Sequence, residues 1–332
     1  MINGYYITKE AVKASKEPMC DNAIARNFAK RIKSFYLFFL ASCIYSFILF
    51  EIIKSFEQPV TPYLVFADVF NNIFEFIPLQ AEILPSLCTT GVQWFVSALF
   101  VVTPVLYALV YKFGENFTLV FAPLIAAFMF GFMWTNAGTL EVTGAVLGGG
   151  WFDGLPRAVG DMFLAGTIYS LSQRLSKVSI TRRGYFVMRF VRALLLLGVA
   201  AFCFMVPQTS PRYRDFVFIP VVFAYLILLM AFPKNSNVFA LPFFAELGKI
   251  STVLFMVHAR TGILINELWP NGNYVVRMIC YYGISILVAF MLYHVVDFVR
   301  SKRLFYLFSL DGHKNRLTNN KLKVYIKCRE LG

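Results

Sequence analysis

The stretch ISTVLFMVHARTGILI, Ile250 to Ile265, is apolar over most of its length and has the residue pattern of a helix. Two ionisable residues, His258 and Arg260, stand near its middle. A helix needs about 20 mainly apolar residues to cross a bilayer, and an ionisable side chain inside such a helix is costly. The stretch therefore predicts a membrane helix with neighbouring helices around it and a polar cavity near its centre.

The composition of the whole chain supports this interpretation. Of the 332 residues, 58% are hydrophobic and 15% are charged, whereas a soluble domain has about 45–50% apolar and about 25% charged residues. The mean hydropathy is +0.65. The formal net charge of +13 is interpreted as a set of topology signals in the loops of a membrane protein, with no nucleic acid as partner.

Eight segments have the length and apolar character of membrane-spanning helices. They are approximately 34–53, 92–111, 117–135, 155–173, 188–206, 215–232, 248–268 and 275–297. The predicted fold class is therefore all-α: a polytopic integral membrane helix bundle of about eight transmembrane helices, without a soluble domain.

The distribution of lysine and arginine predicts the orientation of this bundle. These residues crowd 1–33, 174–192 and 300–332, which an even number of spans puts on the same side. Because positive loops stay in the cytoplasm, both termini are predicted to be cytoplasmic. The predicted organisation is a basic cytoplasmic segment over 1–33, a transmembrane bundle over 34–298 and a basic cytoplasmic tail over 299–332.

Two connecting segments carry separate expectations. Residues 62–80 are rich in apolar side chains but are interrupted by four polar or acidic residues. They are predicted to form a helix on the outer membrane face, with its aromatic side towards lipid. The glycine-rich run at 144–150 is predicted to form a loop near a pore mouth.

Ionisable residues inside the predicted spans are the candidates for chemistry. Arg157 and Asp161 lie one helical turn apart and are predicted to pair, either as a structural ion pair or as part of a site. His258 and Arg260 are about 200° apart around their helix, so they are predicted to face different crevices. His258 itself is either a satisfied buried histidine or a group in a polar cavity.

A basic stretch, ARNFAKRIKSFY, leads into the first predicted span and carries Lys30, Arg31 and Lys33. It is either an orientation signal that contacts anionic lipid, or a clamp for the phosphates of a nucleotide-bearing donor on the cytoplasmic side. The three histidines and six cysteines show no paired metal or redox spacing, so neither a metal site nor a bound cofactor is predicted.

Four stretches together resemble the acyltransferase 3 family, whose polytopic membrane proteins acylate surface glycans and other cell-envelope acceptors. The residues in register with family motifs are Trp94 and Ser97; Arg157, Phe163, Leu164 and Gly166; Leu247, Gly248, Ile250, Ser251 and His258; and Arg31 and Tyr36. The match departs from the family at Ala98 and Leu99, where many members carry a glutamate after the serine.

The start of the chain, MINGYYITK, resembles the end of the family's second membrane helix, with Asn3 in place of the usual serine. The resemblance implies an N-terminal truncation that removes the helix carrying the principal catalytic histidine. Two explanations stay open: the reading frame starts upstream and Met1 is internal, or the protein is a degenerate remnant that is inactive as this chain. Translation of the DNA upstream of Met1 would separate them.

The resemblance implies a membrane-bound O-acyltransferase, an enzyme of the class that transfers groups other than amino-acyl groups. It would move an acyl group, in the first instance acetyl, from the co-substrate acyl-CoA to a hydroxyl of a cell-surface or lipid-linked glycan, in a bacterial-type cytoplasmic membrane. The implied roles are donor binding for Lys30, Arg31 and Lys33, an acceptor pocket for Trp94, Ser97, Arg157 and Asp161, and a secondary catalytic role for His258.

The alternative is a non-enzymatic membrane protein, such as a transporter or flippase for glycans or lipids. Polar residues inside membrane spans fit a transport path as well as an active site. Many transporters are built from two repeated halves with broken helices in matching positions. No such repeat is visible in this sequence, which favours the acyltransferase hypothesis.

Overall fold

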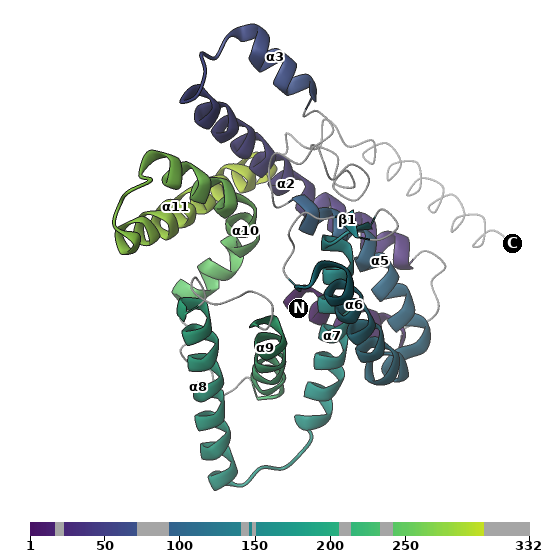
Figure 1. The fold of residues 1–332 in the computed structure, drawn as a ribbon. Coiled ribbons are helices and arrows are strands. Elements are labelled where there is room, and N and C mark those ends of the chain that lie inside the picture. Colours follow the sequence, from purple (N-terminus) through teal and green to yellow (C-terminus); the bar gives the residue numbers. More distant parts are fainter. Residues whose placement is uncertain are drawn as a thin grey trace, which may run out of the picture.

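The computed structural model describes residues 1–16, 23–71, 93–140, 146–147, 151–205, 214–232 and 242–301. These residues are almost entirely helical (Figure 1). The helices are α1 (Ile2–Ala14), α2 (Ala23–Ser55), α3 (Pro62–Asn71), α5 (Gln93–Asn116), the π-helix η3 (Phe117–Phe121), α6 (Ala122–Ala137), α7 (Gly154–Leu175), α8 (Arg182–Met205), α9 (Arg214–Ala231), α10 (Pro242–Leu268) and α11 (Tyr274–Ser301).

Each of the eight predicted segments coincides with a helix, which confirms the helical fold class. Within the described residues, four helical runs are long and apolar enough to cross a membrane: Ile24–Ser55, Ala98–Ala137, Arg182–Ala201 and Tyr274–Ser301. The predicted number of eight crossings, the cytoplasmic location of both termini and the three-part division of the chain stay predictions. Nearly all of the predicted tail, from residue 302 onward, lies outside the described residues.

The run Ala98–Ala137 contains 40 residues, which at about 1.5 Å per residue is roughly twice the thickness of a hydrocarbon core. It is broken at Gly114, whose φ of 60° and ψ of −138° are non-helical. A backbone with positive φ favours glycine because glycine has no Cβ. The gap at 112–116 between two of the predicted spans is therefore a kink at one residue, which leaves room for two crossings.

Helix α7 is the central element of one half of the bundle. It packs against α1, α5, α6 and α9, whereas α2 packs against α5, α10 and α11. Small residues bring α1 and α7 together: a Cβ added at Gly4 would stand 2.5 Å from the carbonyl oxygen of Met162. Such close approach between helices is common in membrane bundles, where packing replaces the hydrophobic effect as the driving force.

Helix α1 belongs to the segment that the sequence predicted to be basic and cytoplasmic. One face of it is buried, at Gly4, Tyr5, Ile7, Thr8 and Ala11. These positions follow the i, i+3, i+4 and i+7 spacing of a single helix face. Hence α1 is an integral part of the bundle, packed between α5 and α7.

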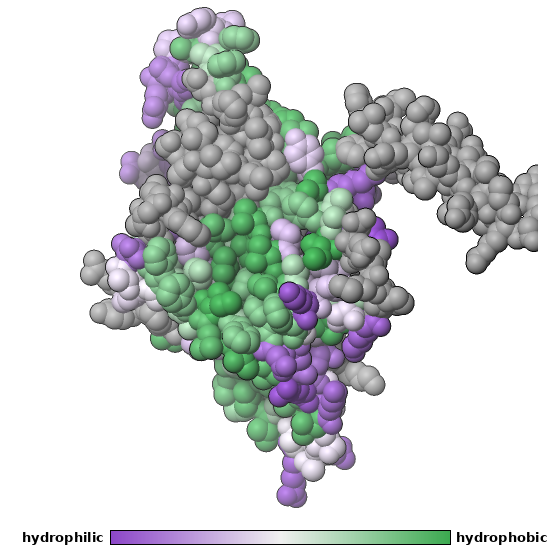
Figure 2. Space-filling model, turned by 90° about the vertical axis from the view of Figure 1, so that its right-hand side faces the viewer, coloured by the Kyte–Doolittle hydropathy of each residue, from purple (hydrophilic) through white to green (hydrophobic). Residues whose placement is uncertain are grey.

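Figure 2 shows hydrophobic side chains gathered over the middle of one face, with hydrophilic ones at the lower tip and along the edges. The lower tip is the connection between α7 and α8 (Figure 1). Its exposed basic residues are Arg174, Lys177, Arg182 and Arg183. This separation of apolar and basic surface is typical of a membrane protein.

The described part of the predicted glycine loop departs from the prediction at one point. Val146 and Leu147 form the short strand β1 (Val146–Leu147), which pairs antiparallel with β2 (Trp151–Phe152). Residues 148–150 between them lie outside the described part. The strands contribute two residues each, so they cap the start of α7 without adding a sheet layer.

Candidate functional site

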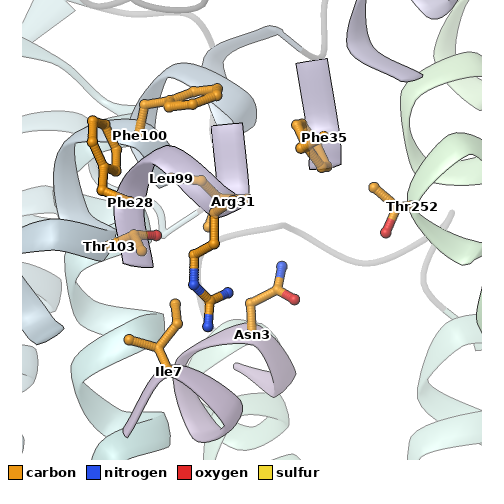
Figure 3. A pocket seen from close by; sticks show the side chains of 9 residues that line it. All are labelled: Asn3, Ile7, Phe28, Arg31, Phe35, Leu99, Phe100, Thr103 and Thr252. Carbon is orange, nitrogen blue, oxygen red and sulfur yellow. The ribbon is translucent and has the colours of Figure 1, made fainter. Parts of the chain in front are cut away.

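A pocket lies between α1, α2, α5 and α10, with an empty volume of about 690 Å³ that includes the space at its mouth. Figure 3 shows the side chains that line it. Three phenylalanines form much of its wall, and Phe100 contacts both Phe28 and Phe35 edge-on at centroid distances of 6.0 and 6.4 Å. The pocket is thus largely apolar.

Polar groups reach the same pocket from four helices. Asn3 comes from α1, Thr103 from α5 and Thr252 from α10, and Arg31 of α2 supplies a cation. The guanidinium of Arg31 points towards Asn3 and Ile7 in Figure 3. An apolar cavity with a few converging polar groups is the usual form of a small-molecule site.

Arg31 is held by two neighbours. Its Nη2 donates to Glu10 Oε2 at 2.7 Å, and its Nε donates to Asn27 Oδ1 at 2.9 Å. Asn27 Nδ2 also donates to the same Glu10 oxygen, at 3.0 Å. These contacts fix the plane of the guanidinium, although about a third of the Arg31 side chain (32%) stays exposed.

Of the three residues predicted to bind the donor, Arg31 lines the pocket. Lys33 is exposed on α2, and lies about 200° around the helix from Arg31. The side chain of Lys30 lies outside the described residues. The donor-binding role of these three residues stays a prediction.

His258 has a defined hydrogen bond within its own helix. Its Nδ1 lies 2.5 Å from the backbone oxygen of Phe255. A carbonyl oxygen only accepts hydrogen bonds, so in the neutral imidazole Nδ1 carries the proton and Nε2 keeps a free lone pair. The Phe255 ring also packs on the ring of Phe95 of α5, with 4.6 Å between the ring centroids, so this face of α10 lies against α5. The geometry gives His258 a nitrogen that can accept a proton.

Arg260 faces a different helix from His258, as predicted from its position around α10. Its guanidinium lies over the ring of Phe50 of α2, 5.7 Å from the centroid. The next residue, Thr261, is buried and its hydroxyl lies 2.8 Å from the hydroxyl of Tyr45, also on α2. Arg260 and Thr261 therefore face α2, and the midpoint of α10 is tied to that helix.

The predicted pair of Arg157 and Asp161 is confirmed. Arg157 Nε lies 3.1 Å from Asp161 Oδ2, and Arg157 Nη1 donates to the backbone oxygen of Leu140 at 2.6 Å. The guanidinium also lies over the ring of Phe130, 5.8 Å from its centroid. Arg157 thus joins α7 to α6 and to the end of the turn that follows α6.

Among the described residues, the contacts of Arg157 and Asp161 and the lining of the Arg31 pocket share no member. The described residues therefore form two separate polar sites, one around Arg31 and one around Arg157. The side chains of Trp94 and Ser97, which were predicted to join the second, lie outside the described part of the chain. Their roles, and the catalytic role of His258, stay predictions.

Sequence reasoning missed Glu10 and Asn27, the partners of Arg31, and the pocket residues Asn3, Thr103 and Thr252. The sequence predicts a basic cytoplasmic segment over 1–33, whose first eight residues resemble the end of a membrane helix, and neither feature predicts that α1 forms a wall of the pocket. The spacing of Gly4, Ile7, Thr8 and Ala11 is the signal that could have identified its packed face.

A family model described as an acyltransferase domain matches residues 1–294. Neither the curated proteins nor the solved structures include a match to this chain.

Proposed function

The chain belongs to the acyltransferase 3 family, and from this premise we propose that it is a multi-pass O-acyltransferase of a bacterial-type cytoplasmic membrane. The proposed donor is an acyl-CoA, with acetyl as the acyl group. The proposed acceptor is a hydroxyl of a cell-surface or lipid-linked glycan. The family and the apolar helices support a membrane acyltransferase, and the finer assignments are the proposal.

The observation that carries this proposal is the pocket around Arg31. Its aromatic and aliphatic wall suits the long, uncharged arm of an acyl-CoA, and its lining cation Arg31 suits a phosphate of the same molecule. Arginine binds phosphate through two parallel N–H···O hydrogen bonds, which are among the stronger hydrogen bonds in proteins. The donor would enter with its phosphates at Arg31 and its acyl end further inside.

The reaction requires little beyond acid–base groups. The acceptor hydroxyl oxygen attacks the thioester carbonyl carbon, the hydroxyl proton passes to a base, and the carbon–sulfur bond breaks to release the CoA thiolate, which is then protonated. A base of suitable pKa and hydrogen-bond donors at the developing oxyanion lower the barrier. We assign His258 a secondary part in proton transfer, supported by the free Nε2 that its Nδ1 hydrogen bond leaves.

The acceptor side is proposed to lie at Arg157 and Asp161, together with Trp94 and Ser97. One carboxylate oxygen of Asp161 is buried without a hydrogen-bond donor in the described residues. A buried carboxylate oxygen without a donor is energetically unfavourable, and a sugar hydroxyl would satisfy it. This supports, for Asp161, an acceptor that is rich in hydroxyl groups.

The test is transfer of radiolabel from acetyl-CoA to membrane glycan, with and without the gene. Arg31→Ala is expected to raise the KM for acetyl-CoA about 10- to 100-fold, since a hydrogen bond to a charged group contributes about 1.5–3 kcal/mol. Arg182→Ala removes the same charge from the exposed start of α8 and should change nothing. Gene-dependent movement of glycan across the membrane, with no label transferred, would instead establish the transporter alternative.

A further inference from the structure

Helix α3 has two unlike faces. Its three aromatic residues, Tyr63, Phe66 and Phe70, are exposed at 78%, 70% and 66%. They fall within about 60° of arc, at 100° per residue, so they form one ridge along the helix. A solvent-exposed ridge of three aromatic rings on a ten-residue helix is unfavourable in water and marks a contact surface.

The opposite face is held against the end of α2. Asp68 lies about 140–160° around the helix from the aromatic ridge, and its carboxylate forms an ion pair with Lys54. Both side chains of this pair are mostly buried, at 17% and 18% exposure. Helix α3 follows the end of α2 in the chain (Figure 1). Its only charged side chain, Asp68, is turned towards α2, and its three aromatic rings are exposed.

The exposed surface of α2 is apolar up to the end of the helix. Ile44, Ile48 and Ile52 are exposed on successive turns of α2, and Phe56 follows just beyond its end, exposed at 54%. Helix α2 is one of the helices long and apolar enough to span a membrane, so this exposed isoleucine row faces lipid. The row ends where α3 begins, which puts α3 at the surface of the same bilayer.

We propose that α3 lies flat in the lipid headgroup layer at the end of α2, with Tyr63, Phe66 and Phe70 inserted at the boundary with the acyl chains. At about 1.5 Å per residue α3 is roughly 15 Å long, which is half of what a crossing requires. Aromatic side chains are enriched at this depth of a bilayer, and amphipathic helices lie there in the plane of the membrane.

The attraction between α3 and the bilayer is hydrophobic, since α3 has no basic residue. Helices that are drawn to a membrane by charge carry lysine or arginine on the polar face and depend on anionic lipids. Binding of α3 to the headgroup layer is therefore expected to be independent of the anionic lipid content and of salt. This contact is separate from the proposed acyl transfer and stands whether or not the chain is an enzyme.

The experiment places a tryptophan on the ridge of the full chain in lipid nanodiscs. Phe66→Trp is compared with the wild type, and the difference in emission reports the added residue. In phosphatidylcholine brominated near the glycerol end of the acyl chains, part of this added emission should be lost, because an interfacial helix buries its apolar face at that depth. The same loss of tryptophan emission is expected when anionic lipid is added and when the salt concentration is high. Gln58→Trp, in the exposed turn before α3, should be quenched by aqueous acrylamide instead.

Three other results would overturn the proposal. Quenching of the Phe66→Trp emission by acrylamide and not by bromine would place the ridge in water. Protection from both quenchers would place it against another protein or a second copy of the chain. Bromine quenching that requires anionic lipid would show an electrostatic attachment, contrary to the charge distribution of α3.

Discussion

Glu10 of α1 and Arg31 of α2 form an ion pair at the pocket, with Glu10 Oε2 2.7 Å from Arg31 Nη2. The carboxylate occupies a donor face of the guanidinium that a phosphate would use. A phosphate-bearing donor must therefore replace Glu10 or bind to the remaining N–H groups. This competition would relate the position of α1 directly to the affinity for the proposed donor.

The first prediction concerns this competition. Glu10→Gln keeps the size and a hydrogen-bonding oxygen but removes the charge, so Arg31 is more available to phosphate. An ion pair as exposed as this one contributes about 0.2–1 kcal/mol, so the KM for acetyl-CoA should fall by up to about fivefold with kcat unchanged. Glu115→Gln, which affects the exposed pair with Arg174, is the matched control. A higher KM for Glu10→Gln would show that Glu10 supports donor binding.

The second prediction concerns His258. His258→Ala removes the free Nε2, and kcat for acyl transfer should fall about 10- to 100-fold, a part of the usual contribution of a general base. His294→Ala in α11 is the matched histidine control. Unchanged transfer at normal expression would remove His258 from the site.

The third prediction tests the contact between α1 and α7. An added methyl at Gly4 would stand 2.5 Å from the Met162 carbonyl oxygen and 2.9 Å from Ala165 Cβ. Gly4→Ala should therefore displace α1 and reduce stability by about 1–3 kcal/mol, as overpacking does. The KM for acetyl-CoA should rise too, because Asn3 and Ile7 of α1 line the pocket.

The control for Gly4→Ala is Gly131→Ala in α6, where an added Cβ meets nothing within 4 Å. In a helix interior this change is expected to be neutral or to stabilise by up to about 1 kcal/mol. Thermal unfolding of the detergent-solubilised protein measures both variants. Equal stability of the two would show that α1 does not pack on α7 as the structure places it.

The helices could be predicted because their signal is local. The segments 155–173 and 275–297 were expected and the structure has Gly154–Leu175 and Tyr274–Ser301. An uncharged apolar run of this length has few alternatives to a helix in lipid. The pairing of Arg157 and Asp161 was predictable for the same reason, since it depends only on i, i+4 spacing.

The pocket could not be predicted because it depends on packing between distant segments. Asn3, Arg31, Thr103 and Thr252 come from four helices, and no pattern within one helix tells which helices are neighbours. Helix α1 shows the difficulty: its charged residues suggested a solvated segment, while its small residues pack against α7. The sequence places a gap between the spans 92–111 and 117–135, and in the structure one glycine with positive φ, Gly114, makes this break.

The last prediction concerns the contribution of the Arg157–Asp161 ion pair to the stability of the protein. Arg157→Ala leaves Asp161 without its guanidinium and frees the Leu140 carbonyl. Removing one partner of a buried ion pair costs about 3–5 kcal/mol. Here the side chains of Arg157 and Asp161 keep 17% and 25% exposure, so we expect a loss of about 1–3 kcal/mol after allowance for solvent. Thermal unfolding in detergent measures it.

Two further variants separate the charge effect from simple truncation of an arginine. Arg157→Ala combined with Asp161→Asn removes the uncompensated carboxylate, so the double variant should be more stable than Arg157→Ala alone. Arg174→Ala breaks a pair whose side chains are 61% and 53% exposed, and should cost less than about 1 kcal/mol. If Arg157→Ala and Arg174→Ala lose the same stability, Arg157 does not join α7 to α6 in the way its contacts with Leu140 and Phe130 indicate.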